Sequence, residues 1–267
     1  MSASKMINDE LLLNTKTQIG KLVVSDSLSR FTRPVILWSG GKSSMVVLHL
    51  IKSLFEKSPF QIPLLMLDDG QHFQETLDFA NDVSRRMNIT ILRQKNEDIL
   101  AHLGKSGLFN VSDLNNESKA LLKSLGYQDG QMQVSPDSEL FNYLLKVLPL
   151  QESIRKYRFD SVFFGDRWAR SKPSEFYVFL HTNDRPHWSE IRPILPFSDD
   201  DIWNYIHQYD VPVNPLYDRG YKTIDGKFNS EFSSEAHNNQ KGSVPERIGS
   251  IADEEAIRQK LKDLGYE

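Results

Sequence analysis

The chain has 267 residues, with 36 acidic and 32 basic side chains, a net charge of −4 at pH 7 and 39% hydrophobic residues. This composition is that of a folded protein of one large or two small domains, and it excludes disordered and collagen-like chains. The slightly acidic total argues against a nucleic-acid-binding protein. No run approaches a length of about 18 apolar residues, and the start of the chain lacks the apolar core of a signal peptide. We therefore expect a cytoplasmic protein that binds neither membranes nor nucleic acid.

The sequence contains no cysteine. This excludes disulfides, cysteine-ligated zinc or iron–sulfur sites and a thiol nucleophile within the chain. The seven histidines show no spacing typical of a zinc site. Any chemistry of this chain is therefore expected to depend on oxygen- and nitrogen-bearing side chains.

The first part of the chain predicts alternating helices and strands. The first thirty residues predict a helix, whose apolar stripe is formed by Leu11, Leu12, Leu13, Ile19 and Leu22. Short apolar runs bounded by turn residues predict buried strands at 34–38, 63–67 and 89–92, with helices at 45–55 and 73–83 between them. This alternation predicts an α/β fold, a doubly wound and mostly parallel sheet with helices on its faces.

The second part predicts an insertion followed by a fourth strand. Residues 104–137 are polar and contain glycine, and we interpret them as an insertion or lid with one short helix at 117–125. A helix over 138–158, broken at Pro149, leads to a strand at 162–164. The sheet is thus expected to have at least one more strand beyond the insertion.

The residue pattern of the sequence changes beyond Pro193. Ser198-Asp-Asp-Asp201 is typical of a capped helix start. Residues 226–246 are rich in serine, asparagine and glycine, and a last helix is predicted around 256–264. We expect residues 1–195 to form the α/β domain, and 196–267 to be a helical and loop segment of the same domain that closes over the strand ends.

The most informative motif is Ser39-Gly-Gly-Lys-Ser-Ser44, which lies where a strand ends and a helix begins. Its glycines allow the backbone to approach a ligand closely, and the free N–H groups of a helix start favour a phosphate. Lys42 adds a positive charge and the three serines add hydroxyl donors. The motif therefore predicts a phosphate-binding loop. The alternative is a tight strand–helix turn with an incidental lysine.

Carboxylates follow the second predicted strand, in Asp68-Asp69-Gly70. Open α/β sheets bind ligands outside the carboxyl ends of their strands. A carboxylate there could hold Mg²⁺ that bridges the phosphates of a nucleotide. The alternative is an aspartate that caps the next helix or forms a turn.

Basic residues follow the fourth predicted strand, at Arg167, Arg170 and Lys172. Arginine is suited to bidentate contact with phosphate or sulfate, which predicts an anion site. From the residues alone, a solvated basic loop is the competing interpretation. Arg192 and Arg219 are weaker candidates of the same kind.

The loop at 39–44 resembles the PP-loop of the adenine nucleotide alpha-hydrolase superfamily. Within it, the closest resemblance is to the family of phosphoadenosine phosphosulfate reductase, the sulfate adenylyltransferase small subunit and FAD synthetase. Further similar segments follow in the same order between about residues 34 and 225, namely Leu64–Gly70, Phe73–Phe79, Phe163–Arg170, Ile191–Phe197, Asp201–Trp203 and Pro215–Tyr221. Their joint occurrence is far more specific than the loop alone.

The resemblance implies a nucleotide-binding domain that uses ATP and Mg²⁺, with attack on the α-phosphorus and release of pyrophosphate. It implies catalytic roles for Lys42, Arg167 and Arg170. The expected nucleotide-binding residues are Ser39, Gly40, Gly41, Lys42, Ser43, Ser44, Asp68, Asp69, Gly70, Gly165, Lys172, Tyr217 and Tyr221. Asp68 and Asp69 are the expected metal ligands.

The acceptor implied by the resemblance is an anionic small molecule, either sulfate or FMN. A sulfate adenylyltransferase small subunit would also imply a GTPase large subunit as partner, because formation of adenylyl sulfate is uphill. Two departures from the family pattern matter here. Ser43 stands where the usual loop has aspartate, and the cysteine of the reductase branch is missing. The third hypothesis is therefore a nucleotide-binding family member without cysteine-dependent reductase activity.

Overall fold

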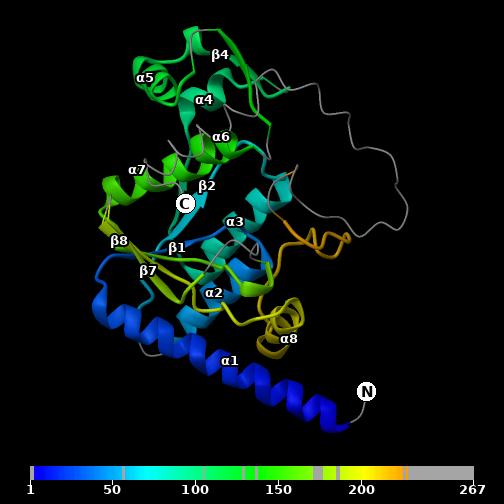
Figure 1. Cartoon of the computed structure of the whole chain (residues 1–267). Helices are drawn as coiled ribbons and strands as arrows, with labels where there is room; N and C mark the ends of the chain where they lie inside the picture. Colours follow the sequence, from blue (N-terminus) through cyan, green and yellow to red (C-terminus); the bar gives the residue numbers. More distant parts are fainter. Residues whose placement is uncertain are drawn as a thin grey trace.

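The computed structural model of the chain describes residues 3–55, 58–104, 106–127, 130–135, 138–170, 177–184, 187–224 and 227 (Figure 1). Within this part of the chain, six strands form one sheet in the order β3-β2-β1-β6-β8-β7. Their bounds are β1 (Pro34–Leu37), β2 (Leu64–Leu67), β3 (Ile91–Gln94), β6 (Ser161–Phe163), β7 (Leu180–Asp184) and β8 (His187–Ile191). All neighbouring pairs are parallel except β7 and β8. The predicted doubly wound, mostly parallel α/β fold is confirmed.

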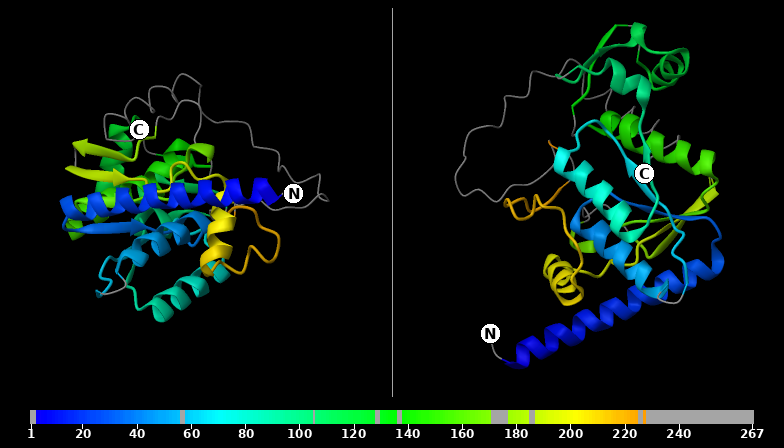
Figure 2. Two further views of the ribbon diagram at one scale, coloured as in Figure 1. Left: turned by 90° about the horizontal axis from the view of Figure 1, so that it is seen from below. Right: turned by 180° about the vertical axis from the view of Figure 1, so that it is seen from behind.

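Helices cover both faces of this sheet (Figures 1 and 2). Those packed around it are α1 (Ala3–Arg30), α2 (Lys42–Lys52), α3 (Gln74–Met87), α7 (Leu148–Tyr157) and α8 (Asp199–Tyr209), with the short turns η1 (Ser53–Phe55) and η4 (Trp168–Arg170). The predicted helices at 1–30, 45–55, 73–83 and from Ser198 onward are thus present, with shifted ends. No helix among the described residues is both long enough and apolar enough to cross a membrane.

Successive side chains of the strands point to opposite faces and enter two separate cores. Ile36 and Phe163 pack in the core shared with α1, α2, α3 and α8. Their neighbours Val35 and Val162 pack in the core formed with α7. Because both faces are covered, these two strands are apolar except for Ser161, which is why the sequence predicts them as buried runs.

The packed face of α1 differs from the predicted one. Of the predicted stripe, Leu13 is buried, whereas Leu11 and Leu22 are 65% and 69% exposed. The buried face includes Gly20, where a Cβ atom would lie 2.9 Å from the backbone oxygen of Pro193. Close backbone packing through a glycine carries no hydrophobic signal, so the sequence pattern favoured the wrong face.

The predicted insertion at 104–137 lies within a larger lobe with its own apolar core, whose buried residues run from Ile99 to Leu145. Its elements are α4 (Glu97–His102), β4 (Leu108–Asn110), η2 (Val111–Asp113), α5 (Asn116–Ser124), β5 (Gln131–Gln133), α6 (Glu139–Asn142) and the π-helix η3 (Tyr143–Val147). The short helix predicted at 117–125 is α5, while the antiparallel pair of β4 and β5 was not predicted. The break predicted at Pro149 is instead a π-helical turn just before it, since Pro149 lies in the first turn of α7. Whether this lobe acts as a lid stays a prediction.

The strand order places a topological switch point between β1 and β6. From β1 the chain continues outward to β2 and β3, whereas β6 and β8 extend the sheet on the other side. Ligands of open α/β sheets bind at such a switch point, beyond the carboxyl ends of the strands. The segments that leave these two ends are the loop at 38–41 and the segment from Phe164 onward.

Two predictions for the C-terminal part have different outcomes. The capping box that begins α8 is present, with Ser198 and Asp201 each accepting a backbone hydrogen bond from the other. The stretch 226–246 that is rich in serine, asparagine and glycine, except for residue 227, and the last predicted helix at 256–264 lie outside the described residues. The domain boundary between residues 195 and 196 stays an expectation. Ile202, Tyr205 and Ile206 of α8 pack in the same core as the sheet.

Candidate functional site

The predicted phosphate loop connects β1 to the first turn of α2. Gly40 has a φ of +79°, a conformation that side chains other than glycine rarely adopt, and a Cβ atom there would lie 3.0 Å from Thr76 Cγ2. Gly41 is the N-cap of α2 and provides no side-chain hydrogen bond to the helix. The first N–H groups of a helix lack partners within the helix, so this start is suited to an anion.

One of these N–H groups is bound by a residue far along the chain. The backbone N–H of Lys42 donates to the Tyr217 hydroxyl at 2.8 Å. Within the loop, the Gly41 N–H donates to Ser39 Oγ at 3.3 Å, and the Ser44 hydroxyl donates to the Gly41 carbonyl at 2.8 Å. Burial raises the pKa of Tyr217 to about 12, so its hydroxyl stays protonated at neutral pH. The loop is thereby held in a turn that faces the segment around Tyr217.

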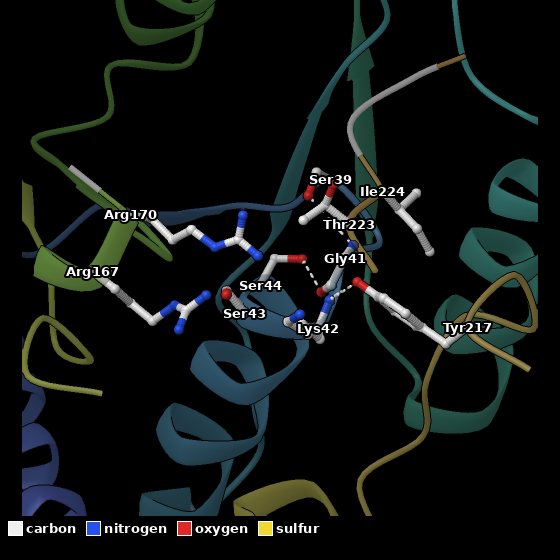
Figure 3. Close-up of a pocket in the computed structure, with 10 residues that line it drawn as sticks. All are labelled: Ser39, Gly41, Lys42, Ser43, Ser44, Arg167, Arg170, Tyr217, Thr223 and Ile224. Atoms are coloured by element: carbon white, nitrogen blue, oxygen red, sulfur yellow. Dashed lines mark hydrogen bonds between the residues drawn. The ribbon is translucent and has the colours of Figure 1, made fainter. Parts of the chain in front are cut away.

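A pocket of about 190 Å³ opens over this loop. Figure 3 shows the two arginines reaching it from one side and Tyr217 from the other. Its lining consists of loop residues, the two predicted arginines and a later segment, namely Ser39, Gly41, Lys42, Ser43, Ser44, Arg167, Arg170, Tyr217, Thr223 and Ile224. Residues from three separate parts of the sequence, 39–44, 167–170 and 217–224, thus meet at the switch point of the sheet.

The Lys42 side chain is largely buried, with 7% of it exposed. Its ammonium nitrogen Nζ lies 2.9 Å from the Lys222 carbonyl oxygen and 3.2 Å from Asp199 Oδ1. The rings of Trp203 and Tyr217 lie within 5.8 Å of the same atom. Burial lowers the pKa of Lys42, and the nearby Asp199 carboxylate opposes this effect. The lysine is therefore held by fixed partners at the edge of the pocket.

The predicted anion loop after β6 approaches the start of α2. A Cβ atom at Gly165 would lie 3.2 Å from Ser43 Cβ and 3.3 Å from Ser44 N, so a larger residue here would push the two loops apart. Beyond it, Arg167 is 3% exposed in its side chain, while Arg170 is 38% exposed. Both predicted arginines line the pocket.

Asp199 forms ion pairs with all three predicted cations, Lys42, Arg167 and Arg170. It was not predicted as a site residue. Its Oδ1 lies 2.9 Å from Arg167 Nη2, and its Oδ2 lies 3.3 Å from Arg170 Nη2. Partial burial would raise the pKa of Asp199, but hydrogen bonds and charge from Arg167 and Lys42 lower it to about 2. Its sequence context, Ser198-Asp-Asp-Asp201, predicts only a capped helix start.

The predicted metal ligands lie at the end of β2 and do not line this pocket. One ligand atom each of Asp68, Asp69 and His72 can lie within 4.8 Å of the others. Asp68 Oδ1 and Asp69 Oδ1 accept hydrogen bonds from Gly70 N and Gln71 N in the turn. These bonds match the alternative of turn chemistry, and the metal role stays a prediction.

A lysine of the π-helix lies beside the same aspartates. Lys146 Nζ is 3.8 Å from Asp69 Oδ2. The Asp69 carboxylate is buried, so this cation offsets part of the cost of its burial. A divalent cation at Asp69 would have to share that carboxylate with Lys146.

The other predicted site residues have different surroundings. Tyr221 does not line the pocket and packs edge-on against Phe73 with ring centroids 5.2 Å apart. Lys172 lies outside the described residues. The weaker candidates are neutralised, because Arg192 pairs with Asp166 and Glu190, and Arg219 pairs with Glu75.

The segment 211–224 packs against α3 and completes the lining of the pocket. Buried Asn214 donates from Nδ2 to Thr76 Oγ1 at 3.0 Å and accepts the Leu216 N–H at 3.1 Å. These bonds fix the turn that carries Tyr217. Thr223 and Ile224 then line the pocket, a role that was not predicted because neither residue type signals a site.

Comparison with known proteins supports the resemblance. The family model described as "Phosphoadenosine phosphosulfate reductase domain" matches residues 33–231. Sulfate adenylyltransferase subunit 2 of Azospirillum brasilense is 26% identical over 218 residues, which cover 73% of this chain and 64% of that protein. The protein of the same name from Geobacter metallireducens is 25% identical over the same length and coverage. The chain thus spans less than two thirds of these relatives.

Two solved structures share the fold. Phosphoadenylyl-sulfate reductase from Candida auris, in a phosphate complex, has a TM-score of 0.54 and 19% identity, and the match covers 80% of this chain and 93% of that one. FMN adenylyltransferase of Candida glabrata, in complex with FAD and inorganic pyrophosphate, has a TM-score of 0.56 and 13% identity, with 81% and 63% covered.

Proposed function

Because this chain belongs to the phosphoadenosine phosphosulfate reductase domain family, we propose that it binds ATP and transfers the adenylyl group to sulfate. The single observation that carries the proposal is the pocket that joins the start of α2 to Lys42, Arg167 and Arg170. Three cations beside the start of a helix suit the phosphates of a nucleotide. The choice of sulfate is supported by the relatives called sulfate adenylyltransferase subunit 2.

In the proposed reaction, an oxygen of the acceptor anion attacks the α-phosphorus of ATP. A new oxygen–phosphorus bond forms, the bond from the α-phosphorus to the bridging oxygen breaks, and pyrophosphate leaves with the electron pair. The residues Ser39 to Ser44 hold the leaving pyrophosphate, and Arg167 and Arg170 bind the acceptor anion or the α-phosphate. Catalysis then depends on positioning and on stabilising the growing charge, without a side-chain nucleophile.

The proposed magnesium site is formed by Asp68 and Asp69. Carboxylate oxygens are the donors that Mg²⁺ prefers, and the two aspartates bring them together at one strand end. A Mg²⁺ ion held there would neutralise phosphate charge. His72 Nε2 lies 2.9 Å from the Leu67 carbonyl, so that nitrogen is engaged in a hydrogen bond and is not proposed as a ligand.

FMN is the second candidate acceptor. It is favoured by the structural similarity to an FMN adenylyltransferase. A sulfate adenylyltransferase would further be expected to act with a GTPase partner, and the name "subunit 2" of the relatives supports a larger assembly for them. The third candidate is a nucleotide-binding protein without turnover, favoured by Ser43 in place of aspartate.

The deciding experiment is exchange of labelled pyrophosphate into ATP with each acceptor in turn. We expect exchange that requires sulfate. Exchange that requires FMN would select the FMN adenylyltransferase alternative. ATP binding without exchange, with either acceptor and with Mg²⁺ present, would select the binding protein. Sulfite release from phosphoadenosine phosphosulfate with reduced thioredoxin would contradict all three, because this chain has no cysteine to carry the reaction.

A further inference from the structure

One carboxylate contacts all three cations of the pocket. Asp199 Oδ1 is shared by Lys42 Nζ at 3.2 Å and Arg167 Nη2 at 2.9 Å. Asp199 Oδ2 lies 3.3 Å from Arg170 Nη2. Oδ1 thus contacts Lys42 and Arg167, and Oδ2 contacts Arg170. Among the described residues, the three cations line the pocket and Asp199 does not.

The position of Asp199 is fixed by the start of α8. Ser198 is the N-cap, and its capping box with Asp201 sets the first turn, in which Asp199 is the first residue. Asp201 Oδ2 also lies 2.6 Å from Lys16 Nζ of α1. The helix start is therefore also anchored to α1. Asp199 is held against the cations by a rigid element rather than by a loose loop.

The charges explain why a carboxylate is needed here. Lys42 and Arg167 are almost fully buried, and a buried cation without a partner is costly. Asp199 is itself 44% exposed, so it offers its charge without being sealed off from solvent. Three positive charges and one negative charge leave a net positive site, which still attracts an anion.

We propose that Asp199 is a built-in counter-ion of the phosphate pocket, and that an anionic di- or polyphosphate ligand competes with it for Lys42, Arg167 and Arg170. The carboxylate keeps the cations together and at the same time lowers the affinity of the pocket for anions. A product such as pyrophosphate is then released more readily than from a site with three unopposed cations. The inference rests on the proposed function only in that the pocket binds phosphates.

The test is calorimetric titration with pyrophosphate of the wild type, Asp199→Asn and the matched control Asp200→Asn. Asparagine at 199 keeps the shape and a hydrogen-bond acceptor but removes the charge, so we expect the Kd for pyrophosphate to fall by about tenfold. Asp200 is exposed on the same turn, and its variant removes the same charge from the same helix start. For Asp200→Asn we expect a change of less than about twofold, because exposed charges are screened.

Three results would overturn the inference. Unchanged or weaker binding by Asp199→Asn would make Asp199 a positioning residue for the arginines. An equal gain in Asp200→Asn would mean that only overall charge matters. A third variant, Asp199→Glu, keeps the charge and is expected to bind pyrophosphate within about threefold of the wild type. A gain in this variant comparable to that of Asp199→Asn would exclude the charge as the cause.

The same titration distinguishes three outcomes: an unstable variant, a pocket that does not bind phosphates, and a pocket that binds them without the proposed role of Asp199. If Asp199→Asn melts too low for calorimetry, the rise in Tm at saturating pyrophosphate reports the affinity instead. We expect a larger rise than in the wild type, and an equal or smaller rise would contradict the inference. No pyrophosphate binding by the wild type would refute the phosphate pocket itself. Binding by the wild type without a gain in Asp199→Asn would refute only the role of Asp199.

Discussion

The Tyr217 hydroxyl accepts the backbone N–H of Lys42 at 2.8 Å, across 175 positions of the sequence. This bond joins the start of α2 to the segment 211–224 at the mouth of the pocket. A second link lies beside it, because Lys42 Nζ donates to the Lys222 carbonyl. The backbone and the side chain of one residue thus hold the closing segment in place over the phosphate loop.

Replacing Tyr217 by phenylalanine tests the first of these links. The Lys42 N–H would lose its acceptor in a partly buried place, so we expect Tyr217→Phe to lower the free energy of unfolding by about 1 kcal/mol. Urea unfolding measures this change. The control is Tyr209→Phe, which alters an exposed tyrosine of α8. Equal unfolding free energies for the wild type and Tyr217→Phe would show that the bond does not hold the segment.

The parts of the site that the sequence could predict are those with a local signature. Ser39 to Ser44 and Gly165 stand at strand ends, where glycine is required by a positive φ or by close approach. Arg167 and Arg170 follow a strand within a few residues. Each of these features can be recognised from neighbours in the chain, because a strand end followed by a glycine turn is a short-range pattern.

The parts that could not be predicted depend on contacts between distant segments. Asp199 has the sequence signature of a helix cap, and only the packing of α8 against α2 brings it to the cations. The antiparallel pair of β7 and β8 was missed because Leu180–Asp184 is polar after its first residue and lacks the apolar run or alternation that indicates a strand. The exposed stripe of α1 was misjudged because Gly20 mediates its packing.

Replacing Lys42 by alanine tests the phosphate loop. The variant removes a positive charge from the pocket, so we expect ATP binding to weaken at least tenfold, about 1.4 kcal/mol, with the fold retained. Calorimetry measures the affinity and circular dichroism the fold. Lys52→Ala, at the other end of α2, is the matched control. An unchanged ATP affinity in Lys42→Ala would mean that the loop is only a turn.

The two arginines are expected to differ in their effect on stability. Arg167 is buried and also donates to the Phe197 carbonyl, whereas Arg170 is 38% exposed. Arg170→Ala should therefore reduce pyrophosphate exchange while changing the free energy of unfolding by no more than about 0.5 kcal/mol. Arg167→Ala should reduce both exchange and stability. Parallel losses of stability and exchange in Arg170→Ala would instead mark that residue as structural.

The pH dependence of stability is expected to report on Asp199. Its pKa is lowered from 3.8 to about 2 in the folded protein. A carboxyl group with a lowered pKa stabilises the fold above its unfolded pKa, and this contribution is lost as the pH falls through the folded pKa. The difference in unfolding free energy between the wild type and Asp199→Asn should thus be full above about pH 4 and should shrink toward pH 2. Urea unfolding over this range measures it, and a constant difference would contradict the assigned ion pairs.

The last prediction concerns Ser43, the second residue of α2, where the family loop usually carries aspartate. An aspartate in the first turn of a helix is favoured by the helix dipole by about 0.3–1 kcal/mol, so Ser43→Asp should fold. Its charge would, however, lie among the residues proposed to bind phosphate, since Ser43 lines the pocket. Such a charge is tolerable beside bound phosphate only when a cation such as Mg²⁺ offsets it.

We therefore expect Ser43→Asp to bind pyrophosphate more weakly without Mg²⁺, and to need less Mg²⁺ than the wild type for half-maximal pyrophosphate exchange. Ser43→Asn has nearly the same shape without the charge and should show neither effect. If only Ser43→Asp exchanges pyrophosphate and the wild type does not, the wild type is a binding protein whose loop has lost its metal-organising residue. If the wild type is active and the Mg²⁺ dependence of all three proteins is the same, position 43 does not organise the metal. In that case Asp68 and Asp69 are the remaining candidates, and alanine at either position should then raise the Mg²⁺ requirement.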